Sequence, residues 1–203
     1  MDASEVGLAV VARAPHEGGH VALLGLAATG WGTFRDSKEA QDGAPDPLDR
    51  WSVRVTTELA QAWGGEALFP FGGPPYHPFI RWASASGRVW PSAMGMAIHA
   101  ERGPWVSFRG AVALAAPLEP VAPGPSPCEG CASKPCLAAC PVDAFAGGAY
   151  DVAACAAHVA SREGAACRER GCLARRACWV GQAWVPEPGR AAFHMAAFVE
   201  ARR

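Results

Sequence analysis

Two short apolar segments near the start of the chain predict β-strands. They are "GLAVVA" at residues 7–12 and "HVALLGLA" at residues 20–27, and the turn-rich "PHEGG" lies between them. Short apolar runs that are bounded by turn residues are typical of buried strands. We therefore expect two buried strands at this end of the chain.

A longer segment has the apolar period of a helix. Asp46 is placed to cap its N-terminus, and Pro47 suits the first helical position. The two glycines at 64 and 65 end the helix. The apolar residues that recur at helical spacing are Leu48, Trp51, Val55, Leu59 and Ala62. These signals predict a helix that begins at Pro47 and ends before residue 64.

More strands are expected before residue 117. The candidates are "EALFPF" at 66–71, "MGMAIHA" at 94–100, "PWVSF" at 104–108 and "GAVALAA" at 110–116. A proline-rich loop that runs into a short helix is expected over "GGPPYHPFIRW" at 72–82. Together these elements predict an N-terminal α/β domain over residues 1–116.

The composition changes at residues 117–127, "PLEPVAPGPSP", where five of eleven residues are proline. Proline interrupts regular structure, so we expect a linker here. The third segment, residues 128–203, holds all eight cysteines and three short helical patterns, at 151–163, 172–178 and 189–203. The predicted fold class is α+β, with an α/β layer followed by a module of loops and short helices.

Composition and charge restrict the classes of partner. Half of the 203 residues are apolar, so a buried core is expected, and the formal charge of −1 gives no field that would attract nucleic acid or an anionic membrane. Asp2 and Glu5 lie where a signal peptide would be positive, and glycines interrupt the most apolar stretch well short of a bilayer span. We expect a cytoplasmic protein that binds neither nucleic acid nor membrane.

The most specific pattern is "CEGCASKPCLAACP", residues 128–141, with the spacing C-x2-C-x4-C-x3-C-P. Clustered thiolates select zinc or an iron–sulfur cluster, and a reducing compartment disfavours the disulfide alternative. The bacterial ferredoxin run is C-x2-C-x2-C-x3-C-P, so only the middle gap differs here. A zinc knuckle would need histidine where Cys136 stands, although an all-cysteine zinc site stays open as an alternative.

The remaining four cysteines complete the count for two 4Fe–4S clusters, which together need eight thiolates. In two-cluster ferredoxins the last cysteine of each run binds the other cluster. On that rule one cluster takes Cys128, Cys131, Cys136 and Cys178, and the other takes Cys140, Cys155, Cys167 and Cys172. Arg175 and Arg176 lie between the last two cysteines, where they either offset cluster charge or form a solvated helix face.

"CEGCASKPCLAACPVDAF" at 128–145, followed by a cysteine in "YDVAACAAHV" and a later cysteine group, resembles the iron–sulfur portion of epoxyqueuosine reductases and reductive dehalogenases. The resemblance implies two 4Fe–4S clusters that reduce a corrinoid held by a nitroreductase-like domain. Residues 1–116 are shorter than a full corrinoid-binding domain, and no corrinoid-contacting residue is placed on them. The chain also resembles small ferredoxin-like bacterial proteins that share "LFPFGGPP", "DPLDRWS" and "GCLARRAC".

The sequence therefore predicts a ferredoxin-type 4Fe–4S electron-transfer protein that works with a redox partner protein. Two alternatives stay open. One is a reductase whose clusters reduce a cofactor, such as a corrinoid, or a substrate held by the N-terminal domain. The other is a zinc-stabilised binding module without a redox role.

Overall fold

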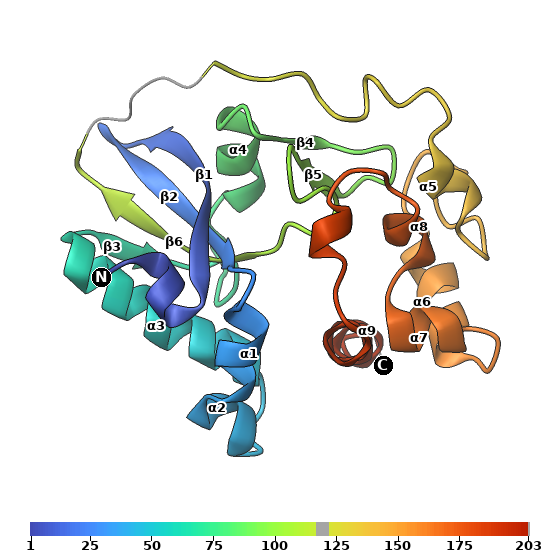
Figure 1. Cartoon of the computed structure of the whole chain (residues 1–203), viewed down its shortest axis with the longest axis horizontal. Coiled ribbons are helices and arrows are strands. Elements are labelled where there is room, and N and C mark those ends of the chain that lie inside the picture. Colours follow the sequence, from blue (N-terminus) through green and yellow to red (C-terminus); the bar gives the residue numbers. More distant parts are fainter. Residues whose placement is uncertain (117–121, 203) are drawn as a thin grey trace. The chain divides into compact units, whose positions relative to one another are not determined.

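The computed structural model describes residues 1–116 and 122–202 (Figure 1). The chain forms two compact units, one of Met1–Val89 with Val106–Gly124 and one of Trp90–Trp105 with Pro125–Arg203. Residues 90–105, which we expected in the N-terminal domain, thus group with the cysteines. Of the expected linker at 117–127, residues 117–121 lie outside the described residues.

The first unit contains a four-stranded antiparallel sheet. Its strands are β1 (Leu8–His16), β2 (Gly19–Leu26), β3 (Glu66–Leu68) and β6 (Phe108–Leu114), in the order β1-β2-β6-β3. The strands predicted at 7–12, 20–27 and 110–116 are confirmed. The strand predicted at 66–71 is only three residues long. Of the strand predicted at 104–108, only Phe108 is in a strand, so that prediction was wrong.

Strand β2 lies inside the sheet, where it pairs with β1 and β6. Its central residues Val21, Leu23 and Leu24 are fully buried, which explains the continuous apolar run in the sequence. Helix α3 (Pro47–Trp63) packs on β6 and β3, and α4 (Phe79–Ala85) packs on β1 and β2. The sheet and its two helices thus share one core.

Helix α3 follows its prediction except at two residues. Leu48, Trp51, Val55 and Leu59 are buried, and Gly64 ends the helix in the left-handed conformation. Asp46 occupies the N-cap with a φ of 50°, but its side chain accepts no capping hydrogen bond. Ala62 is exposed and Ala60 is buried instead, because the buried face drifts along the helix.

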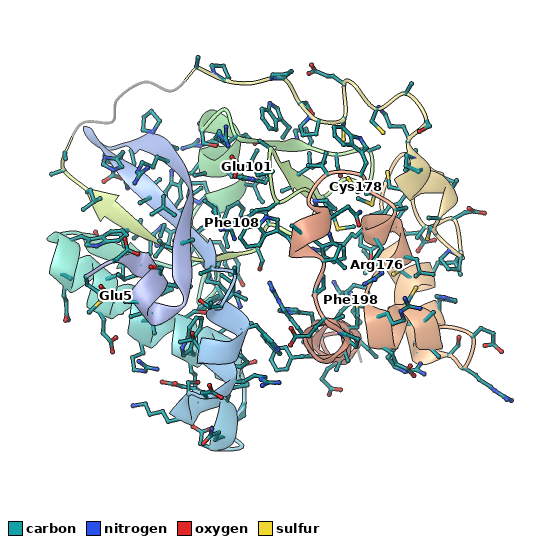
Figure 2. All side chains as sticks on the ribbon, viewed as in Figure 1. Glu5, Glu101, Phe108, Arg176, Cys178 and Phe198 are labelled. Carbon is teal, nitrogen blue, oxygen red and sulfur yellow. The ribbon has the colours of Figure 1, made fainter. Side chains whose placement is uncertain are left out.

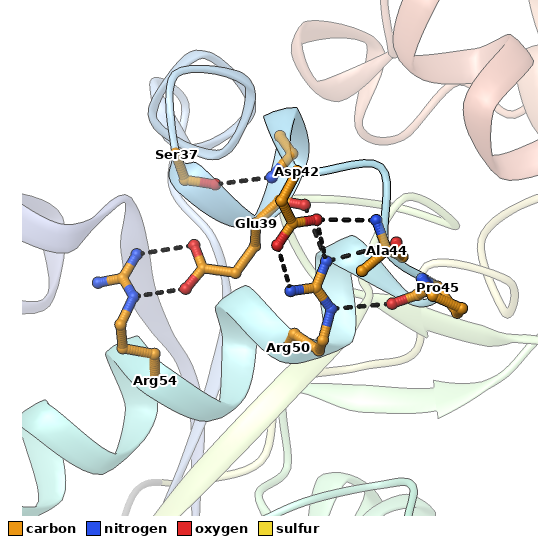
Figure 3. A network of polar contacts seen from close by, with 8 residues as sticks. Ser37, Glu39, Asp42, Ala44, Pro45, Arg50 and Arg54 are labelled. Carbon is orange, nitrogen blue, oxygen red and sulfur yellow. Dashed lines mark hydrogen bonds and ion pairs between the residues drawn. The ribbon is translucent and has the colours of Figure 1, made fainter.

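Two short helices before α3 were missed by the sequence patterns. These are α1 (Gly30–Arg35) and α2 (Lys38–Gln41). Arg54 of α3 donates two hydrogen bonds to the buried carboxylate of Glu39, at 2.7 and 3.1 Å (Figure 3). Arg50 likewise binds Asp42, with both bonds at 2.7 Å. The paired residues are eight and fifteen positions apart and lie on different elements, so the periodicity of one segment could not show these contacts.

The second unit consists of a small hairpin and short helices. The hairpin strands are β4 (Val89–Pro91) and β5 (Ala97–His99), so the strand predicted at 94–100 is confirmed only in part. The helices are α5 (Pro135–Ala138), α6 (Val152–Ala160), α7 (Ala165–Arg170), α8 (Leu173–Arg176) and α9 (Pro188–Glu200). Helices α6, α8 and α9 match the three predicted patterns, whereas α5 and α7 were not predicted.

The chain as a whole is α+β, as predicted. A short 3-10 helix precedes β1 (η1, Ala3–Val6) and another precedes α9 (η2, Gln182–Trp184). Within the described residues, no helix has the length and apolar character that a bilayer span requires.

Candidate metal centre

The eight cysteines all lie in the second unit and all are free thiols. Cys136 lies within α5, Cys155 within α6 and Cys167 within α7, and Cys172 and Cys178 flank α8. The other three, Cys128, Cys131 and Cys140, lie on the loops around α5. Short helices and tight loops therefore carry every thiol that the sequence identified as a ligand.

Lys134 organises the first cysteine loop. It takes the left-handed conformation, with a φ of 42°, directly before α5. Its ammonium group donates hydrogen bonds to the main-chain carbonyls of Cys128 and Cys131. The two additional residues that distinguish this run from the ferredoxin spacing thus form part of a closed loop.

Four thiols form the first electrostatic set. Burial raises the pKa of Cys136, and the charges of Cys178, Cys128 and Cys131 raise it further. Burial also raises the pKa of Cys178, to which Cys128 and Cys131 again contribute. Cys128 also packs against the apolar cluster that contains Cys178, and the Cys131 N–H donates to the Cys128 carbonyl at 3.3 Å. We call Cys128, Cys131, Cys136 and Cys178 the first set.

The other four thiols form a second set. Burial raises the pKa of Cys155, and the charges of Cys140 and Cys167 raise it further. Burial is also the main cause that raises the pKa of Cys172, with a smaller contribution from Cys155. All four line a single small cavity with Phe145, Val159 and Met195. Cys140, Cys155, Cys167 and Cys172, the second set, therefore surround a common apolar space.

Main-chain N–H groups point at several of the sulfur atoms. The N–H of Ala144 donates to Cys140 Sγ at 3.3 Å. Main-chain N–H groups of Ala174 and Arg175 lower the pKa of Cys172, and that of Val180 does the same for Cys178. Hydrogen bonds of this kind favour thiolates and raise the potential of a bound cluster.

The two sets meet in one apolar core. Cys136 of the first set and Cys140 of the second are buried in a cluster that also contains Met94, Phe145 and Ala174. Helix α5 packs on α8 at this place. Any groups held by the two sets would therefore be neighbours, and the surrounding apolar side chains would exclude water from the space between them.

The β4–β5 hairpin and the loop that follows it, up to residue 105, support the first set. The sequence patterns missed this feature. Ile98 packs with Cys178 and Val180, and Cys128 packs against the same cluster. Gly103 and Gly181 allow this close approach, because a Cβ on Gly103 would lie 2.1 Å from the Val180 carbonyl and one on Gly181 would lie 2.2 Å from the Arg102 carbonyl. The only sequence signal for this close approach was the glycine at each of the two positions.

Arg175 and Arg176, which the sequence left open between two roles, differ in the structure. Arg175 stacks on Trp105 at 4.4 Å and lowers the pKa of Cys172. Arg176 makes an exposed hydrogen bond to the Arg170 carbonyl. Trp179, next to Cys178 (labelled in Figure 2), is 62% exposed and so does not cover its neighbour.

No three His, Cys, Asp or Glu side chains in the described part of the chain lie close enough together to hold one metal ion. A 4Fe–4S cluster differs from a single ion because each of its four irons binds its own cysteine thiolate. The chemistry and number of the donors fit such a cluster in each set.

Comparisons of the chain with protein-family models, with curated proteins and with solved structures found no match.

Proposed function

We propose that this protein carries two 4Fe–4S clusters and transfers single electrons to or from a redox partner protein. The observation that carries the proposal is the division of eight free thiols into two sets of four, one of which lines a common cavity. The crossing of ligands in two-cluster ferredoxins predicts the same two groups from the cysteine spacing alone. Spacing and geometry therefore support the same two ligand sets.

When bound, 4Fe–4S clusters supply reversible one-electron transfer. The residues of this chain control the surroundings of the thiolates. The buried cluster around Met94, Phe145 and Ala174 excludes water, and main-chain N–H groups beside Cys140 and Cys172 stabilise the thiolates. We propose that the second unit is a ferredoxin-like module and that it works in the cytoplasm, where thiols stay reduced.

Metal analysis of the protein purified without oxygen tests this function. We expect about eight irons and about eight sulfides per chain, and an electron paramagnetic resonance signal after reduction. An iron content of about four per chain would indicate a single cluster. A colourless protein that contains zinc and no iron would overturn the proposal in favour of the zinc-stabilised module. Titration of the reduced protein with a corrinoid tests the reductase alternative, for which tight binding is the expected result.

A further inference from the structure

An open groove lies on the surface of the second unit, beside α9. Helix α9 packs on α6 and α7 (Figure 1), and the groove, of about 420 Å³, lies among these three helices. Its apolar lining consists of Ala160, Met195, Ala196 and Val199. A space of this size accommodates a large side chain of another molecule.

Met195 lies between this groove and the second thiol set. Its side chain lines the groove, and it also lines the small cavity that the four cysteines of the second set surround. Val159 lines that same cavity, and the next residue, Ala160, lines the groove. A molecule seated in the groove would therefore contact a side chain that also borders the space of the second set.

Two arginines place positive charge at the groove. Arg168 is held at the end of α6, because its Nη1 donates hydrogen bonds to the carbonyls of Val159 and Ser161, both at 2.8 Å. Arg162 lies on the loop after α6 and is exposed. Glu200 also lines the groove. Within the part of the chain that the structure describes, neither arginine forms an ion pair, so both cations can attract an external anion.

The charge of the chain is unevenly distributed along the sequence. Residues 160–203 hold eight arginines and four glutamates, a formal charge of +4, although the chain as a whole carries −1. The residues that line the groove all belong to this basic segment. Opposite charges on two proteins speed their encounter and orient them, so this surface favours a partner with an acidic face.

We propose that this groove is the docking site of the redox partner, and that the partner presents an acidic surface with an apolar side chain that enters the groove. This inference rests on the proposed function. In the docked complex one electron passes between the partner and the cluster of the second set, so one is oxidised as the other is reduced, and no bond forms or breaks. Electron-transfer pairs associate through small interfaces, for which one groove with neighbouring cations is sufficient.

Three substitutions separate the groove from the net charge of the chain. Arg162→Glu reverses an exposed charge at the groove, and Ala196→Trp fills the groove without changing its charge. Neither residue lines the cavity of the second set. Arg35→Glu is the matched control, because it changes the net charge as Arg162→Glu does but lies exposed on α1 in the first unit. Arg168 is left unchanged because its hydrogen bonds hold the end of α6.

The test is stopped-flow measurement of electron transfer from the reduced, cluster-loaded protein to two carriers of opposite charge, acidic flavodoxin and basic cytochrome c. For flavodoxin we expect a rate constant that falls as salt rises. Arg162→Glu should lower it about tenfold at low salt and much less at high salt, and Arg35→Glu should stay close to the wild type. Ala196→Trp should lower it at every salt concentration, because salt does not screen bulk. Arg162→Glu should not slow transfer to cytochrome c.

The outcomes separate this inference from the function on which it rests. Iron-free wild-type protein would overturn the proposed function. If both clusters are present and Arg162→Glu and Ala196→Trp match the wild type with flavodoxin, the docking site is rejected and the function stands. A similar loss in Arg35→Glu, a flavodoxin rate that rises with salt, or transfer to cytochrome c alone would also reject it. Iron content is measured for each variant, and if Ala196→Trp loses iron, Arg162→Glu decides.

Discussion

The charge of Cys178 raises the pKa of Cys136, although α6, α7 and α8 separate the two residues along the chain. Helix α8 packs on α5, and this contact brings Cys178 back to the loop that holds the earlier cysteines. Cys140, only four residues after Cys136, instead lines the cavity of the second set. The two sets are therefore interleaved in sequence and lie next to each other in the second unit.

This interleaving predicts which cysteine substitutions are equivalent. Cys136→Ala and Cys178→Ala should each remove the cluster proposed for the first set, leaving about four irons and the same remaining resonance signal. Cys140→Ala and Cys167→Ala should each remove the cluster proposed for the second set and leave only the resonance signal of the first. Iron analysis and electron paramagnetic resonance of the four variants check the pairing. A signal shared by Cys178→Ala and Cys167→Ala would contradict the two sets.

The approach of Gly181 to the hairpin predicts a second effect on the first cluster. Gly181 has a φ of 80°, and an added Cβ would lie 2.2 Å from the Arg102 carbonyl. Gly181→Ala should therefore displace the segment next to Cys178 and lower the occupancy of the first cluster more than that of the second. The measurement is iron content together with the two resonance signals.

Gly148→Ala is the control for backbone strain. Gly148 has a φ of 76°, close to that of Gly181, but no atom lies within 4 Å of an added Cβ. Both substitutions carry the strain of a left-handed residue, of about 1 kcal/mol, and only Gly181→Ala adds a clash. Equal loss of the first cluster in both variants would show that the hairpin does not support it.

The sequence predicted the parts of this structure that depend on local patterns. The continuous apolar run of β2 and the helical period of the segment that begins at Pro47 can be read directly from the sequence. Cysteine spacing predicted the two groups of four thiols, and their role as cluster ligands stays a prediction. The hairpin under Cys178 and the position of Arg175 were not, because each depends on a contact between distant segments that leaves only a glycine or a charge in the sequence.

The ion pair between Glu39 and Arg54 predicts how stability depends on pH. Hydrogen bonds from Arg54 lower the pKa of Glu39 from its ordinary value of 4.5 to about 2. Folding therefore favours the ionised carboxylate of Glu39. The stabilisation from this ion pair is complete above about pH 5 and is lost as the pH falls toward 2. We expect Glu39→Gln to lower the free energy of unfolding by about 2 kcal/mol at pH 7, since Arg54 is partly exposed.

Thermal unfolding of both proteins between pH 7 and pH 3, followed by circular dichroism, measures this effect. The difference between wild type and Glu39→Gln should shrink as the pH falls. Asp42→Asn is the matched control, because Asp42 also accepts two hydrogen bonds from an arginine but lies at the exposed surface. A loss in Asp42→Asn as large as that in Glu39→Gln would show that burial of the carboxylate is unimportant.

The N-cap of α6 links local helix stability to the cluster that we propose for the second set. The side chain of Asp151 accepts a hydrogen bond from the Ala154 N–H at 2.9 Å, and the helix that it caps carries Cys155. Asp151→Ala should lower the free energy of unfolding by about 1 kcal/mol, and Asp151→Asn should retain most of the cap. Because a frayed first turn would release Cys155, the second cluster should be lost to a chelator sooner than the first in Asp151→Ala. Urea unfolding and the decay of each resonance signal test this, and equal decay of both signals would separate the cap from the cluster.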